Sequence, residues 1–153
     1  MKLAEALIIR ADLQKRIAQL KSRLKDRARV QEGDEPAENI QELRQELDGV
    51  LVQLEALIYR INVTNMQTMY EGESLTRLMA RKDVLTTRLS VLRELVEHVT
   101  GGDTRYGRNE IKYVRTVDVA ALRRSVDEYS KQLRELDTTI QGLNWTTELV
   151  EAE

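Results

Sequence analysis

The sequence contains no cysteine and no phenylalanine, and it has only one proline, one histidine and one tryptophan. Without cysteine the chain forms no disulfide bond and offers no thiolate for catalysis or for a sulfur-ligated zinc site. A di-metal helical bundle needs Glu-x-x-His on two helices, whereas the only histidine, His98, has Leu95 three places before it. The sequence therefore excludes thiol chemistry and the ferritin-like class, and we predict no bound metal or cofactor.

Long apolar runs are also missing. No stretch approaches the roughly 18 apolar residues of a membrane-spanning helix, and Glu5 and Arg10 interrupt the apolar residues near the N-terminus. The net charge of −2 does not supply the basic surface that phosphate attraction requires. We therefore expect a cytoplasmic protein that neither spans a membrane nor binds nucleic acid.

Charge is nevertheless distributed unevenly along the chain. Residues 1–31 carry nine Lys and Arg against three Asp and Glu, whereas residues 32–58 carry one Arg against eight acidic residues. The simplest explanation is that two helices of opposite charge lie side by side. In the alternative, the basic first segment faces nucleic acid or an anionic membrane.

What the chain does have is apolar residues spaced alternately three and four apart, which is the pattern of packed long helices. This heptad pattern occurs in four segments, near residues 2–30, 39–61, 75–99 and 119–143. The clearest seam consists of Val119, Leu122, Val126, Tyr129, Leu133, Leu136, Ile140 and Leu143. We predict one mainly all-α domain over residues 1–153, in which four long helices form an antiparallel bundle or coiled coil.

The second segment has a broader apolar face than its seam alone requires. Leu51 and Ile58 lie beside the seam positions and widen the stripe. A broad apolar face implies more than one neighbouring helix.

Residues between the seams predict where the helices begin and end. Asn39 and Asp118 are suitable N-caps for the second and fourth helices, and Ser74 or Thr76 for the third. Gly33 suits a left-handed residue after the first helix. Because the heptad phase survives residues 62–74, one helix over 39–99 stays open as an alternative to two.

The connections predict a small β element. Residues 111–117 alternate in the way that strands do, with Ile111, Tyr113 and Val117 on one side. A lone strand is not stable, so we expect this segment to pair with residues near 67–70.

The most site-like stretch is the irregular segment 105–112. Two arginines beside Gly107 suit bidentate binding of a phosphate or carboxylate. The alternative is that they pair with acidic helix faces and attach the segment to the bundle. With nearby connections, the candidate ligand-binding residues are Arg105, Tyr106, Arg108, Lys112, Asn62, Asn65, Asn144 and Trp145.

Two cations, Arg10 and Lys82, occupy positions in phase with the apolar seams. A charged residue at such a position selects register and partner when it meets an acid across an interface. Alternatively, the long side chain extends its charged end into solvent.

Several pieces after residue 60 resemble the septicolysin-like family of small bacterial proteins. They are Ile61–Asn65, Arg81–Leu85, Arg105–Lys112, Thr116–Arg123 and Leu136–Trp145. The resemblance implies a mostly helical, self-associating protein, and the family name implies cytolytic activity. It assigns no catalytic residue.

Three hypotheses for function follow. The leading one is a non-enzymatic helical protein that forms homo-oligomers or binds a protein partner, because no catalytic constellation accompanies the seams. The second is an enzyme or small-ligand binder that uses the residues around 62–65, 105–112 and 144–145. The third is a membrane-active protein of the septicolysin type.

Overall fold

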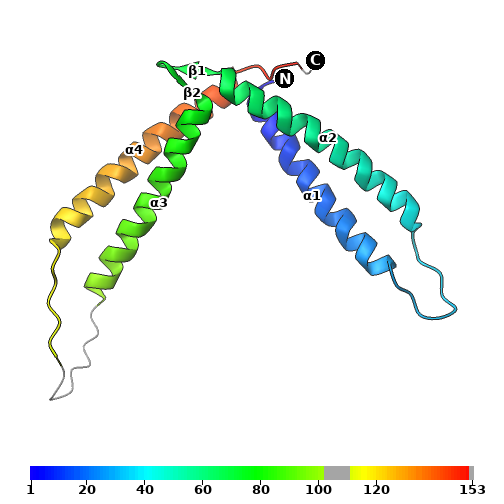
Figure 1. Ribbon diagram of the computed structural model, residues 1–153, viewed down its shortest axis with the longest axis horizontal. Coiled ribbons are helices and arrows are strands. Elements are labelled where there is room, and N and C mark those ends of the chain that lie inside the picture. The colour runs from blue at the N-terminus through cyan, green and yellow to red at the C-terminus, as the bar shows by residue number, and fades with distance from the viewer. Residues whose placement is uncertain (102–110, 152–153) are drawn as a thin grey trace. The chain divides into compact units, whose positions relative to one another are not determined.

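The computed structural model describes residues 1–101 and 111–151. In these residues the chain forms, in order, α1 (Leu3–Arg27), α2 (Ile40–Gln67), β1 (Met69–Tyr70), β2 (Glu73–Ser74), α3 (Leu75–Thr100) and α4 (Val119–Thr146) (Figure 1). This confirms the mainly helical class, with four long helices and a small antiparallel sheet. None of the described helices is long and apolar enough to cross a membrane.

The chain divides into two compact units. The first comprises Met1–Leu75 together with Gly142–Glu153, and the second comprises Thr76–Gln141. Each unit contains one pair of long helices. That all 153 residues form a single domain stays a prediction.

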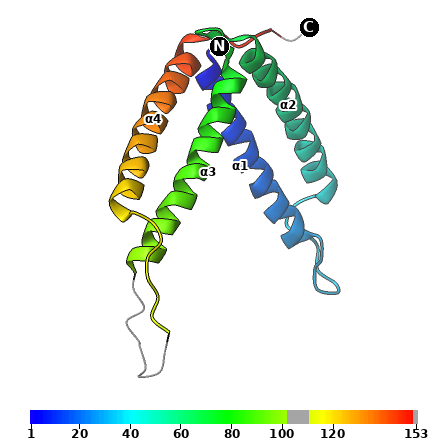
Figure 2. The same ribbon diagram turned by 60° about the vertical axis from the view of Figure 1, so that its left-hand side comes forward.

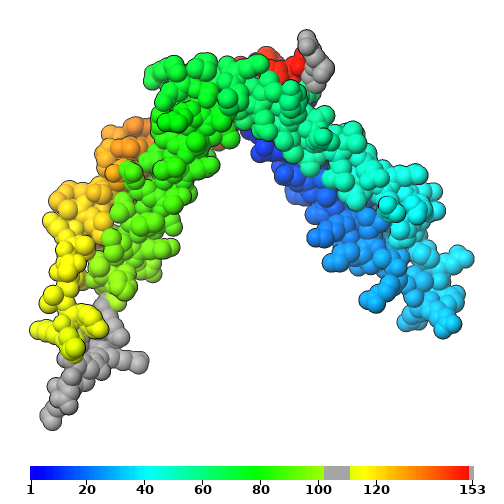
Figure 3. Space-filling view, viewed as in Figure 1, coloured from blue at the N-terminus to red at the C-terminus, as the bar shows by residue number. Residues whose placement is uncertain are grey.

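In the first unit, α1 and α2 form an antiparallel hairpin closed by their apolar seams. Leu20, Leu43 and Val50 are buried at its centre. The partly buried residues packed against them are Leu13, Ile17, Leu24 and Leu47. The two helices lie against each other along their length (Figure 3). The heptad spacing thus forms the core that the sequence predicts.

The connection between α1 and α2 follows its turn residues. Helix α1 ends at Arg27, earlier than expected, and Gly33 adopts a φ of +89° in the turn beyond it. The side chain of Asn39 accepts hydrogen bonds from the backbone N–H groups of Gln41 and Glu42, at 2.9 and 3.3 Å. The predicted cap of the second helix is confirmed, because these donors have no partner inside the helix.

Residues 68–74 separate α2 from α3, so the alternative of one continuous helix over 39–99 is wrong. Glu71 and Gly72 both have positive φ and form the turn between β1 and β2. The prediction that 111–117 pairs with 67–70 is also wrong, because Met69 pairs with Ser74 and residues 111–117 form no strand. A partner a few residues away along the chain costs less loop entropy than one some forty residues away.

The segment after α4 is attached to both helices of the first unit. Leu3 N donates to Thr147 O at 2.9 Å, and Leu149 N donates to Met1 O at 2.8 Å. On α2, Arg60 Nε donates to Val150 O at 2.8 Å, and Val150 N donates to the hydroxyl of Thr64 at 3.1 Å. The backbone of this segment is therefore hydrogen-bonded although it is neither helix nor sheet.

In the second unit, α3 and α4 run antiparallel (Figure 2). Lys82 Nζ lies 2.6 Å from Asp137 Oδ1, and the guanidinium of Arg88 lies over the ring of Tyr129, 4.8 Å from its centroid. The buried seam residues are Leu78, Leu85, Leu89 and Ile140. The predicted N-cap of the fourth helix is confirmed, since Asp118 Oδ1 accepts from Ala121 N at 3.1 Å.

Candidate functional site

The residues of the predicted ligand site fall in different parts of the chain's structure. Arg105, Tyr106 and Arg108 lie outside the described residues. Lys112 is exposed in the irregular segment before α4, and Asn62 is exposed on α2. Lys112 belongs to the second compact unit and Asn62 to the first.

The remaining predicted site residues lie near the ends of α2 and α4, in the first unit. Asn65 and Asn144 are buried, with 9% and 7% of their surface exposed, whereas Trp145 is 56% exposed. Within the described residues no hydrogen bond joins the two amides. An anion site built from these residues therefore stays a prediction.

Three surface grooves of the described residues lie at other places. One of about 290 Å³ is lined by residues of α3 and α4, namely Arg93, Val96, Glu97, Arg123, Val126 and Asp127. A second, of about 340 Å³, lies beside Arg23 and Glu38 in the first unit. A third, of about 370 Å³, follows α3 beside Arg77, Arg81 and Arg88. Each is open to solvent and has charged side chains in its lining.

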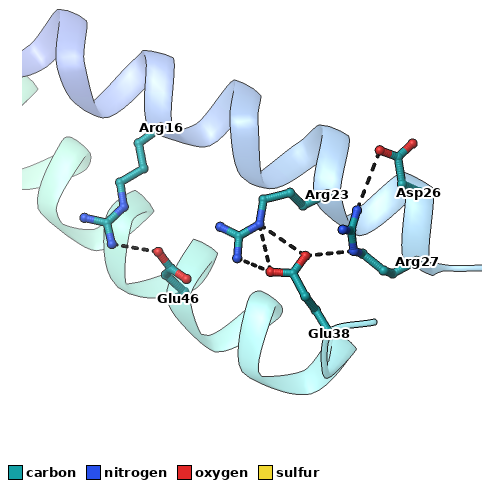
Figure 4. A network of polar contacts seen from close by, with 6 residues as sticks. All are labelled: Arg16, Arg23, Asp26, Arg27, Glu38 and Glu46. Atoms are coloured by element: carbon teal, nitrogen blue, oxygen red, sulfur yellow. Dashed lines mark hydrogen bonds and ion pairs between the residues drawn. The ribbon is translucent and has the colours of Figure 1, made fainter. Parts of the chain in front are cut away.

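One flank of the α1–α2 hairpin carries ion pairs that join α1 to α2 and to the segment just before α2 (Figure 4). Glu38 is held by Arg23 and by Arg27, whose Nε lies 2.7 Å from its carboxylate. Arg16 Nη2 lies 2.7 Å from Glu46 Oε1. Hydrogen bonding from Arg23 lowers the pKa of the Glu38 carboxyl. The basic first segment and the acidic second segment thus lie side by side, as their charges predicted.

The rest of α2 carries large apolar side chains that the described residues leave exposed. Leu51 and Ile58 are 42% and 37% exposed, and Val52, Tyr59 and Met66 are 67%, 64% and 60% exposed. We call these five residues the exposed stripe. Leu51 and Ile58 lie seven residues apart, and Val52, Tyr59 and Met66 follow one another at the same spacing. The stripe therefore has the same period as the seam, which suits packing against another long helix.

Sequence reasoning identified the widening at Leu51 and Ile58 but missed the row formed by Val52, Tyr59 and Met66. The seam of α2 already contains an apolar residue at every expected position, so the sequence pattern needs no further row to explain packing on α1. The missed signal is the same seven-residue spacing two positions beyond the seam residues Val50 and Leu57.

Several charged residues on the hairpin lack partners among the described residues, and Lys15, Lys21 and Lys25 on α1 are examples. The side chains of Arg10 on α1 and of Asp48 and Glu55 on α2 make no ion pair or hydrogen bond with any described residue. Lys82, the other cation in phase with a seam, is paired with Asp137 inside the second unit. The two predicted seam cations therefore differ, and of these two only Arg10 is without a partner among the described residues.

Fold and surface define a helical-hairpin protein with an exposed apolar helix face. A model of a family of unknown function, DUF6847, matches residues 10–149, and the chain belongs to this family. The chain is also similar to a crystal structure described as a functionally unknown conserved protein from Corynebacterium diphtheriae. The two are 42% identical, with a TM-score of 0.91, over 98% of this chain and 99% of that chain.

No curated protein matches the chain. The family and the similar crystal structure are both described as being of unknown function, so these matches assign no ligand, substrate or assembly. The resemblance to septicolysin-like proteins is not tested by these matches and stays a prediction.

Proposed function

We propose that this chain is a non-enzymatic protein that works by self-association through its long helices. The observation that carries this proposal is the exposed stripe on α2, where five large apolar side chains are each at least 37% exposed. Apolar surface left in water costs roughly 25 cal/mol per Å², and contiguous apolar patches on soluble proteins commonly mark interaction sites. Tyr59 adds an aromatic ring, a residue type enriched in the energetic centres of interfaces.

The periodicity of the stripe favours a helical partner over a small ligand. A ligand site is concave and brings a few polar groups together. The stripe instead follows one side of a long helix, with repeats of seven residues. Heptad repeats present side chains at intervals that match the side chains of another heptad helix.

Sedimentation velocity of the whole chain, from micromolar to submillimolar concentration, tests the proposal. We expect the weight-average sedimentation coefficient to rise with concentration towards that of a dimer or larger oligomer. A single species of monomer mass over the whole range would overturn the proposal. Light scattering coupled to size exclusion supplies a mass that does not depend on molecular shape.

A further inference from the structure

Building on the proposed self-association, we propose that two copies of the α1–α2 hairpin stack face to face. In this arrangement α1 of one copy lies on the side of the exposed stripe formed by Leu51 and Ile58 of the other copy. Arg10 of each copy then lies between Asp48 and Glu55 of the other. The partner is a second copy of this chain, and the three charged residues determine how the copies align.

The contacts within the hairpin give the level of each residue along its length. Arg16 faces Glu46 and Arg23 faces Glu38, so residue numbers rise along α1 as they fall along α2. By the same register Arg10 lies level with Val52, within the span from Asp48 to Glu55. A two-fold axis parallel to the helices keeps every residue at its level in the second copy. Arg10 of the second copy is then level with the same span.

The helical rotation places Leu51 of α2 and Arg10 of α1 on a shared flank of the hairpin. With 3.6 residues per turn, Leu51 lies about 140° around α2 from Glu46, and Arg10 lies about 120° around α1 from Arg16. Both are therefore turned away from the ion-paired flank. Leu7, three residues before Arg10, is half-buried on the same side of α1 and offers an apolar contact for Leu51 and Ile58.

The charges complement each other when the copies stack in this way. Helix α1 has seven Lys and Arg against three acidic residues, whereas α2 has two Arg against four acidic residues. The two-fold arrangement places each basic α1 over the acidic α2 of the other copy, so the favourable contact occurs twice. Stacking α1 on α1 would bring like charges together, which is unfavourable.

The available area suits a dimer of hairpins. Helix α1 has 25 residues and is about 37 Å long, and two helices side by side are about 20 Å wide. One face of the hairpin thus presents about 740 Å², close to the roughly 800 Å² that each partner buries in a stable interface. A single helix presents about half that area, so the partner has to cover both helices.

A charge-exchange experiment tests this arrangement on the full chain. We expect Arg10→Glu to weaken the dimer at least about tenfold, because it places three acids together in two symmetric contacts. The double variant Asp48→Lys/Glu55→Lys should weaken it similarly, because it places three cations together. Mixing the two variants should restore dimers. In the mixed dimer the acid introduced at position 10 meets the two introduced lysines, while Arg10 of the double variant meets the native Asp48 and Glu55 of the other chain.

The control is Lys15→Glu, which makes the same charge change on α1 but lies about 140° around the helix from Arg10. It should dimerise like the unmodified chain and should not pair selectively with the double variant. Circular dichroism melting checks that each variant is folded.

Unchanged dimers of Arg10→Glu, or mixed dimers that form equally with Lys15→Glu, would overturn this arrangement and leave self-association standing. An unmodified chain that stays monomeric, or a stripe covered by another part of the same chain, would overturn both. Selective mixed dimers of the Arg10→Glu chain with the double variant would support both.

Discussion

The two helical hairpins have similar seams but differ in whether the cation within the seam has an ion-pair partner. In α3–α4 the seam cation Lys82 meets Asp137 at 2.6 Å inside the same unit. In α1–α2 the arginines Arg16, Arg23 and Arg27 are paired on one flank, while Arg10 has no partner among the described residues. A charged residue in phase with a seam is therefore satisfied in one hairpin and left available in the other. The difference supports the proposal that the interface lies on the α1–α2 hairpin.

The largest expected effect is the loss of stability when a core residue of the first hairpin is truncated, compared with a residue of its exposed stripe. Leu20 is 1% exposed, so Leu20→Ala should lower the free energy of unfolding by roughly 2–5 kcal/mol through lost burial and a residual cavity. The matched change Leu51→Ala, at a residue 42% exposed, should cost much less. Urea unfolding followed by circular dichroism, at a concentration where the chain is monomeric, measures both. Equal losses would mean that the stripe is part of the core.

The next effect concerns association rather than folding. Tyr59→Asp places a charge in the middle of the exposed stripe and should raise the dimer dissociation constant at least about tenfold, equivalent to about 1.4 kcal/mol. The melting temperature of the monomer should change little, because Tyr59 is 64% exposed. Gln53→Asp, at an exposed residue on the same helix but outside the stripe, is the control. Sedimentation that responds equally to both changes would remove the stripe from the interface.

Much of the fold follows from local features of the sequence, whereas the β element and the surface depend on competition between partners. Seam spacing and the caps Asn39 and Asp118 act over a few residues, and so the helices could be predicted. Residues 111–117 alternate as a strand does, but their expected partner, the segment near 67–70, pairs instead with Glu73–Ser74, which is much closer along the chain. Sequence pattern does not report such competition, because it depends on which contact closes the shortest loop.

The candidate site was harder to predict for a related reason. A polar loop attracts a functional interpretation, while an apolar residue at heptad spacing is assigned to the core. Exposure is what distinguishes Tyr59 from Leu57, and exposure depends on which helices are neighbours. Arg10 and Lys82 likewise look equivalent in sequence, and only the position of Asp137 beside Lys82 separates them.

A smaller loss of stability is expected when the ion-paired seam cation of the second hairpin, Lys82, is replaced. Lys82→Met removes the partner of Asp137 while keeping an unbranched side chain of similar length. Since the pair is more than a third exposed, the free energy of unfolding should fall by at most about 1 kcal/mol. The pKa of Asp137, which hydrogen bonding from Lys82 lowers, should rise towards its ordinary value. Carboxyl NMR titration measures it, and Arg10→Met is the control that should leave Asp137 unchanged.

The smallest effect concerns acid sensitivity on the ion-paired flank of the first hairpin. Because Arg23 lowers the pKa of Glu38 in the folded chain, this carboxylate stabilises the fold above its unfolded pKa. That contribution is lost as the pH falls through the lower folded value. Glu38→Gln should therefore show a smaller drop in urea midpoint than the unmodified chain between neutral and strongly acidic pH. Glu55→Gln, which removes from α2 a carboxylate that has no partner among the described residues, should leave the drop unchanged in the monomer. If both variants flattened the profile equally, Glu55 would have a partner in the isolated hairpin, and the contrast between its two flanks would disappear.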